Sequence, residues 1–429
     1  MSSTTREAAS APTATPNRWL LLLGGVLVQM AIGAVYAWSV FGKALQSDSS
    51  LLQLTKTQAA IPFEVAIGMI FVGSFIGGRI QDRKGPRTVA LTGVVIYSIG
   101  IILSSFARGE GQLWLLVLGY GVLSGFGLGM AYIVPIAMLQ KWFPDKAGLI
   151  TGLAVGGFGF GAVITAPLAT SLIAKDPAHP TSPFLWLGIA YLIAGVLGAS
   201  VFRNPPQGYT VGAAPAKSSA GASGTSPATA QASPGADFTQ QEALRTPQWY
   251  LLTLILTISV TAGISLISVA AGSATDIAGY SAAGAGALVG IMGLFNGAGR
   301  ILWASLSDKI GKMTAFVGIL GLQGLALIAL PHVGNAAMFA VLAAIIYTCY
   351  GGGFGTMPST AGRFFGVKNA GGIYGLMLLG WSIGGVAGPL LATALIGDDK
   401  NYTLAFTTLG VIALVGAAIP LITKAPRRR

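Results

Sequence analysis

Apolar segments long enough to cross a lipid bilayer recur along the whole of this chain. A helix rises 1.5 Å per residue, so about 20 apolar residues span the hydrocarbon core. Such segments run over residues 18–42, 57–80, 88–107, 112–139, 147–173, 184–203, 248–274, 284–307, 313–331, 335–361, 369–396 and 402–423. We therefore expect an all-α membrane protein with twelve transmembrane helices.

The low charge of the chain argues against a soluble fold. Charged residues make up 9% of its 429 residues, against roughly 25% in an ordinary soluble protein. The net charge of +12 would suggest a nucleic-acid partner for a soluble chain. Here the Lys and Arg residues stand between apolar segments, where membrane topology explains them. We expect the chain to lie in a lipid bilayer and to bind no nucleic acid.

Residue types that build enzyme centres are scarce. The two histidines, His179 and His332, are far apart, and the one cysteine, Cys349, lies inside an apolar segment. The sequence contains no Ser–His or metal-ligand pattern. The glycine run at 351–355 does not indicate a nucleotide-binding loop, because it lies inside an apolar segment with no preceding strand. We therefore expect no enzyme activity, no catalytic residue, no metal and no cofactor.

The helices fall into two groups of six. The first six occupy residues 18–203 and the second six occupy 248–423. The segment 204–247 between them is rich in Ala, Gly, Ser and Pro, so we expect a flexible cytoplasmic linker. Residues 1–17 have a similar composition and predict a disordered N-terminus, while residues 424–429 form a basic tail.

The basic residues of the loops predict the orientation of the chain. If both termini are cytoplasmic, 19 of the 25 Lys and Arg residues lie inside, five lie outside, and one, Arg300, lies within a helix. Cytoplasmic loops carry such an excess of positive charge. We therefore predict that both termini are cytoplasmic.

A loop motif occurs once in each half, at matching positions. The pattern small-x-x-x-Asp-basic-x-Gly runs from Gly78 to Gly85 and again, 226 residues later, from Ala304 to Gly311. Its simple interpretation is a tight cytoplasmic turn with a glycine at its corner. The functional interpretation is a rim contact that locks one conformation, and its candidate gating residues are Asp82, Arg83, Asp308 and Lys309. Because duplicated halves are typical of transporters, we expect a binding site between them. The motif resembles the loop signature of the major facilitator superfamily.

Arg300 is the most informative single residue. It lies inside the eighth apolar segment, and arginine stays protonated at any working pH. Burying the charge costs a few kcal/mol, so the side chain either reaches the headgroups or faces a wet cavity with an anion. We favour a bidentate clamp for a carboxylate, with Asn296 one turn away as a further donor.

The sequence around Arg300 resembles one branch of that superfamily. The run from Leu294 to Gly311 is similar to the eighth helix of bacterial oxalate–formate antiporters, and the stretches at 36–39 and 245–249 match the same family. The stretch 142–161 resembles the fifth-helix signature shared with monocarboxylate transporters. This resemblance implies that Arg300 binds the substrate anion. It also implies that the protein lies in the inner membrane of a bacterium.

One departure from that family bears on the substrate. Oxalate–formate antiporters carry a lysine in helix eleven that faces the arginine, and here Trp381 stands at that position. One fixed cation balances one carboxylate. We therefore predict a small monocarboxylate, such as lactate, pyruvate, acetate or formate, rather than oxalate.

A second departure bears on what drives transport. Animal monocarboxylate transporters carry an aspartate one turn before the arginine, where this chain has Asn296. A symporter must return empty, which exposes the charge of Arg300 unless an acid offsets it. We predict proton symport, with Asp276 or Glu64 as the acid, although each also reads as an ordinary loop or structural acid. An anion exchanger, which never returns empty, is the alternative.

Aromatic residues complete the predicted pocket, because tyrosine hydrogen-bonds a carboxylate while presenting an apolar wall. The candidates in the central helices are Tyr36, Tyr132, Tyr347, Tyr350, Tyr374 and Trp381, each of which is also an ordinary packing residue. A non-transporting carboxylate sensor is the third hypothesis. It would need an output domain, and the longest segment outside the membrane is the linker.

Overall fold

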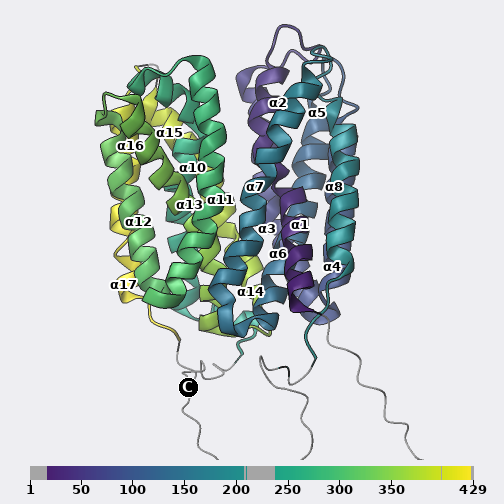
Figure 1. Cartoon of the computed structure of the whole chain (residues 1–429), viewed down its shortest axis with the longest axis vertical. Coiled ribbons are helices and arrows are strands. Elements are labelled where there is room, and N and C mark those ends of the chain that lie inside the picture. The colour runs from purple at the N-terminus through teal and green to yellow at the C-terminus, as the bar shows by residue number, and fades with distance from the viewer. Residues whose placement is uncertain (1–16, 207–208, 210–236, 398, 427–429) are drawn as a thin grey trace, which may run out of the picture.

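The computed structural model describes residues 17–206, 209, 237–397 and 399–426, and this part of the chain is helical (Figure 1). Twelve of its helical spans are long and apolar enough to cross a membrane, as the sequence predicted. The all-α membrane fold is confirmed. Residues 1–16 of the N-terminus predicted to be disordered over 1–17, most of the linker and the last three residues lie outside the described residues.

The first six spans form one bundle. Three of them are single helices, and the others contain a break or a short preceding turn. Spans two, three and six are the single helices α3 Lys56–Lys84, α4 Pro86–Ser104 and α8 Pro183–Ser200. Span one consists of α1 Arg18–Ile32, η1 Gly33–Ala37 and α2 Trp38–Leu45, and span four of α5 Leu113–Leu116, η2 Val117–Ser124 and α6 Gly125–Trp142. Span five consists of η3 Pro144–Lys146 and α7 Ala147–Ile173.

The last six spans form the second bundle, preceded by a short helix. The long helices of this half run through the full thickness of the bundle, about 45 Å for 30 residues. The short helix is α9 Gln240–Leu244, and spans seven, eight and ten are the single helices α10 Pro247–Ala278, α11 Ala282–Ile310 and α13 Ala336–Phe365. Span nine consists of α12 Lys312–Ala329 and η4 Leu330–His332, span eleven of α14 Ala370–Met377 and α15 Leu379–Ile396, and span twelve of α16 Tyr402–Gly416 and α17 Ile419–Ile422.

The flexible linker predicted at 204–247 requires a correction at its C-terminal end. Residues 240–244 form α9, because Thr239 and Glu242 make a capping box. The preceding Phe238 accepts a hydrogen bond from Asn369 (2.7 Å) and donates one to Phe365 (2.9 Å). This end of the linker is therefore fastened to the loop before α14.

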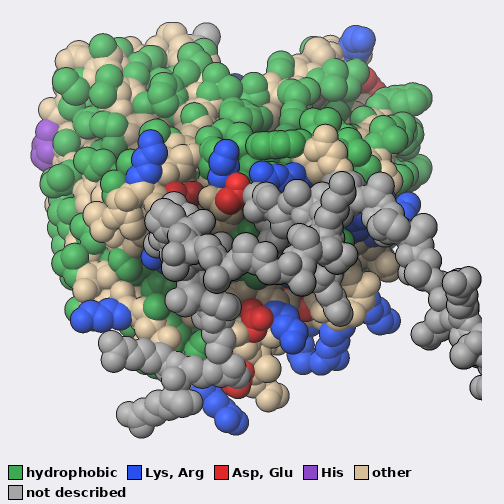
Figure 2. Space-filling model, turned by 60° about the horizontal axis from the view of Figure 1, so that its bottom comes forward, with side chains coloured by type: hydrophobic (Ala, Val, Ile, Leu, Met, Phe, Trp, Pro, Cys, Tyr) green, Lys and Arg blue, Asp and Glu red, His purple; other side chains and the backbone are tan. Residues whose placement is uncertain are grey.

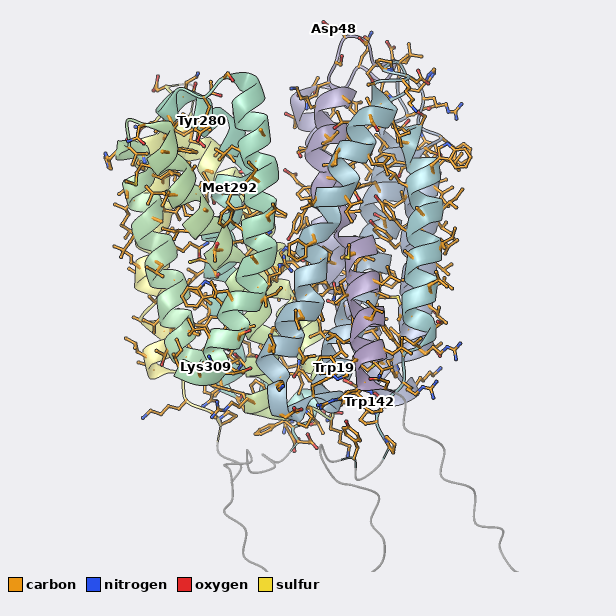
Figure 3. All side chains as sticks on the ribbon, in the orientation of Figure 1. Trp19, Asp48, Trp142, Tyr280, Met292 and Lys309 are labelled. Carbon is orange, nitrogen blue, oxygen red and sulfur yellow. The ribbon has the colours of Figure 1, made fainter. Side chains whose placement is uncertain are left out.

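Both described ends of the chain lie at the same end of the bundle, which we name the terminal end. Trp19, Trp142 and Lys309 lie there, and Asp48 and Tyr280 lie at the opposite end (Figure 3). Lys and Arg side chains gather on the surface of the terminal end (Figure 2). This clustering agrees with the charge bias that predicts the orientation.

The two halves touch at the terminal end and diverge toward the opposite end (Figure 1). Among the described residues, every hydrogen bond between the halves lies within about 30 Å of the terminal end along its helix. The bond farthest from that end joins Tyr36 to Tyr350. The structure is therefore the state in which the terminal end is sealed.

Candidate functional site

Arg300 lies at the interface of the two halves, with its side chain fully buried. Its Nε donates to Asn296 Oδ1 (3.4 Å) and its Nη1 to the Val155 carbonyl (3.4 Å), both long bonds. The guanidinium also lies 5.4 Å from the ring of Phe158 and 5.0 Å from that of Phe354. No carboxylate among the described residues contacts it. Asn296, predicted as a further donor to the substrate, thus lies beside Arg300 and accepts its N–H, and among the described residues the charge has no counter-ion.

Hydrogen-bond donors without partners surround this charge. Within the part of the chain that the structure describes, Arg300 Nη2, the hydroxyls of Tyr132 and Tyr374, and Trp381 Nε1 are buried and unpaired. The Tyr132 hydroxyl lies next to both Arg300 and Tyr374, at distances that allow at most long, weak hydrogen bonds to them. Because a buried donor without a good acceptor is costly, the free Nη2 of Arg300 and the three donors around it indicate a site built for an acceptor, namely an anion.

Aromatic rings wall this donor cluster. Trp381 lies 5.4 Å from Tyr132, 5.7 Å from Phe158 and 4.8 Å from Phe354, measured between ring centroids. Tyr132 in turn meets Phe158 edge-on at 5.3 Å. The four rings come from both halves, so that the site exists only while the halves are together.

Two tyrosines close the site on the side away from the terminal end. The hydroxyls of Tyr36 and Tyr350 lie 3.2 Å apart, in a hydrogen bond between the halves. Tyr36 stands where the first span narrows to the 3₁₀ segment η1. Phe354 follows Tyr350 by one turn and packs against it edge-on at 5.3 Å. Arg300 is therefore enclosed from both ends.

One predicted pocket residue lies apart from this cluster. Tyr347 is buried in the hydrophobic core of the second half, and its hydroxyl has no partner among the described residues. No contact links it to Arg300 there.

The sequence did not identify the fifth span as part of the site. Phe158 and the carbonyl of Val155 come from α7, whose glycines allow α11 to approach. A Cβ on Gly159 would lie 2.8 Å from Gly297 Cα, and one on Gly152 would lie 2.7 Å from the Arg300 carbonyl. The glycine spacing of α7 was the available signal, since small residues mark close helix crossings.

The two candidate acids for proton coupling lie far from Arg300. Asp276 is at the opposite end of α10, where it accepts hydrogen bonds from Lys400 (3.0 Å) and Tyr402 (2.7 Å) of its own half. Glu64 is half-buried in α3, about 12 Å from the start of that helix, whereas Arg300 is about 27 Å from the start of α11. Neither acid neutralises the arginine in this state.

The two motif aspartates each bind the N-terminus of a helix in the other half. Asp82 accepts from the backbone N–H groups of Gly371 (3.3 Å) and Gly372 (2.7 Å), at the start of α14. Asp308 accepts from the N–H of Leu149 (3.2 Å), at the start of α7. Helix N-termini attract negative charge, so these contacts are favourable bonds between the two halves at the terminal end.

The basic residues of the two motifs take no part in these contacts. Arg83 and Lys309 are exposed, and Lys309 projects at the terminal end (Figure 3). Asp308 instead pairs with Lys312 (2.6 Å), and Lys141 lies 3.9 Å from Asp82. The helices α3 and α11 also continue through both aspartates, and the predicted turns follow at Gly85 (φ 88°) and Gly311 (φ 94°).

Sequence comparison agrees with this architecture. A sequence model of the Major Facilitator Superfamily matches residues 18–377 and 257–429. The chain belongs to the Major Facilitator Superfamily. It is therefore a membrane transporter and not an enzyme, as the sequence predicted.

Individual proteins also match over nearly the whole chain. The oxalate:formate antiporter of Oxalobacter formigenes is 28% identical over 94% of this chain and 90% of its own. The apicoplast pyruvate carrier 1 of Toxoplasma gondii is 27% identical over 100% of this chain and 94% of its own. Among solved structures, the Escherichia coli fucose:proton symporter matches with a TM-score of 0.67 at 14% identity, over 94% of this chain and 98% of that one. The last similarity concerns the fold alone.

Proposed function

We propose that the protein is a secondary transporter of small monocarboxylates that works by alternating access, with Arg300 as the carboxylate ligand. The observation that carries the proposal is the buried, unpaired Nη2 of Arg300 among three further unpaired donors. The two oxygens of a carboxylate offer acceptors for the guanidinium and for the two tyrosine hydroxyls beside it. The names of two relatives, a formate-exchanging antiporter and a pyruvate carrier, support the same substrate class.

The charge of the site favours a monoanion. Arg300 is the one cation in contact with the aromatic walls among the described residues, and Trp381 occupies the position predicted for a second cation in an oxalate carrier. A dianion would bring an uncompensated negative charge into a buried site, which costs several kcal/mol or more. Lactate- and pyruvate-like acids fit this balance, and oxalate does not.

The contacts between the halves support alternating access. With both termini cytoplasmic, as the loop charges favour, the sealed terminal end is the cytoplasmic side of the cell membrane. Release of Asp82 and Asp308 from the helix N-termini would open that side, and separation of Tyr36 from Tyr350 would open the other. The aspartates are the gating residues of this proposal; Arg83 and Lys309, which are exposed, are not part of it.

Anion exchange is the second candidate for coupling, and one observation favours it over proton symport. Arg300 is enclosed with no carboxylate beside it. An empty carrier would have to bury this bare charge each time it returns, which costs a few kcal/mol. An exchanger returns loaded and avoids that step. Symport requires an acid such as Glu64 to approach Arg300 in another state.

Transport in proteoliposomes tests the proposal. We expect saturable uptake of labelled pyruvate or lactate in the wild type and none in Arg300→Gln, with Arg87→Gln, an exposed arginine at the terminal end, as the matched control. Saturable uptake by Arg300→Gln would contradict the assignment. Saturable binding without uptake in the wild type would indicate the carboxylate sensor instead.

The same vesicles separate the two coupling modes. Exchange predicts that uptake requires an unlabelled monocarboxylate inside and persists without a pH gradient. Symport predicts uptake into empty vesicles that is driven by an acidic exterior and abolished by a protonophore. If symport works through Glu64, Glu64→Gln should remove the response to pH, and if it works through Asp276, Asp276→Asn should do so; in exchange, both variants should leave uptake unchanged.

A further inference from the structure

Trp381 contributes a polar group to the site as well as an apolar wall. Its indole ring is fully buried, and Nε1 has no hydrogen-bond partner among the described residues. The ring packs on Phe158 and Phe354, the same two phenyl rings that flank the guanidinium of Arg300. A charged donor and a neutral donor therefore share one aromatic enclosure.

The indole is held in place by its surroundings. Trp381 lies in the first turn of α15, just after the break in span eleven at Leu378. The neighbouring Ser382 donates a hydrogen bond to the carbonyl of Ile67 in the other half (2.8 Å). With three ring contacts around it, the indole N–H is positioned before any ligand arrives, which lowers the entropic cost of using it.

The two kinds of donor make different demands on a ligand. Arg300 takes the carboxylate, because charge-assisted bonds to a guanidinium are the stronger ones. The indole N–H is a neutral donor that any oxygen acceptor satisfies. A small acid with an oxygen on C2 offers that second acceptor next to its carboxylate, whereas an acid with a bare C2 leaves the N–H buried and unpaired.

We propose that Trp381 is a specificity-determining residue whose indole N–H donates to the C2 oxygen of the substrate, so that the carrier selects 2-oxo and 2-hydroxy monocarboxylates over unsubstituted acids of the same size. This inference rests on the proposed carboxylate transport through Arg300 and adds the chemical class of the substrate. It also gives Trp381 a role of its own, in addition to its standing where oxalate–formate antiporters carry a lysine.

Pyruvate and propionate are the decisive pair, since they differ at C2 in the oxygen and match in length and charge. We expect wild-type kcat/KM for pyruvate to exceed that for propionate by on the order of tenfold, the effect of leaving one buried donor unpaired. Trp381→Phe, which keeps the ring contacts and removes the N–H, should abolish most of this preference while retaining uptake that depends on Arg300.

Two further variants keep the test decisive. Trp303→Phe makes the same change at an indole that lies against Gly352 and Gly318, and it should leave the preference as in the wild type. Trp381→His, which retains a ring N–H, should keep more of the preference than Trp381→Phe and serves if the Phe variant fails to accumulate.

The outcomes distinguish this inference from the proposed function. Equal wild-type transport of pyruvate and propionate, both lost in Arg300→Gln, would overturn the role of Trp381 and leave monocarboxylate transport standing. A preference for pyruvate that survives in both Trp381 variants would do the same. If the wild type transports none of these acids, the proposed function itself is wrong.

Discussion

The carboxylate of Asp82 accepts a 2.7 Å hydrogen bond from the backbone N–H of Gly372, 290 residues away in the other half. Asp308 makes the corresponding contact with the N–H of Leu149 at 3.2 Å. In each case an acid at the end of one long helix binds the first turn of a helix that begins across the interface. Because the helix dipole adds to the hydrogen bonds, we expect the two contacts to stabilise the closed terminal end in the same way.

Weakening one of these contacts should open the terminal end more often. Asp82→Asn removes the charge but keeps the shape, and hydrogen bonds to charged groups contribute about 1.5–3 kcal/mol, so we expect the sealed state to lose on the order of tenfold in population. Hydrogen exchange of the backbone amides at 371–375 would report this loss as faster exchange in detergent or nanodiscs.

The control for that variant lies next to it in the sequence. Arg83 is exposed and has no ion pair among the described residues, so Arg83→Gln should exchange at the wild-type rate. Equal exchange in Asp82→Asn and Arg83→Gln would show that Asp82 does not hold the end closed.

The crossing of α13 and α11 should tolerate no added methyl group beside Arg300. A Cβ on Gly355 would lie 2.1 Å from the Arg300 carbonyl, which forces the two helices apart. Overpacking of this kind costs about 1–3 kcal/mol. We therefore expect Gly355→Ala to lower both the thermal stability of the purified protein and its carboxylate uptake.

Gly290 on α11 provides the comparison, because a Cβ there meets no atom within 4 Å. Gly290→Ala should match or slightly exceed the wild-type melting temperature, since alanine is the better helix former. The prediction for Gly355 is wrong if both variants melt with the wild type.

The Tyr36–Tyr350 bond should make a small contribution to closing the site on the side away from the terminal end. It joins two neutral hydroxyls at 3.2 Å, and such bonds contribute about 0.5–1.5 kcal/mol. Tyr36→Phe should therefore raise the dissociation rate of bound substrate severalfold, as measured by washout of labelled pyruvate, with Tyr347→Phe, away from the site, as the control. An unchanged rate would place the rate-limiting step elsewhere.

The sequence predicted the fold well because bilayer thickness imposes a length that recurs twelve times. The sequence also indicated Arg300, Asn296 and Trp381 as candidates, because a charge inside an apolar helix is unusual and the family resemblance points to the residues around it; their roles stay predictions. The contributions of Phe158 and Val155 were not, because phenylalanine and a backbone carbonyl carry no distinctive pattern and their position depends on how two helices cross. The partners of Asp82 and Asp308 could not be predicted either, because they are backbone N–H groups, which almost every residue has.

Asn296 offers a way to change the coupling of the carrier. Its Oδ1 accepts from Arg300 Nε at 3.4 Å, so an aspartate of the same shape would place a negative charge beside the guanidinium. Asn296→Asp should then compete with the substrate for Arg300 and lower uptake at neutral pH by on the order of tenfold or more, the effect of a charge-assisted bond. Protonation of the introduced carboxylate would free the arginine, so uptake should rise more steeply with external acidity than in the wild type. Asn296→Ala, which lacks the acid, separates this effect from loss of the amide: if its pH profile matches that of Asn296→Asp, an acid at this position does not couple protons to transport.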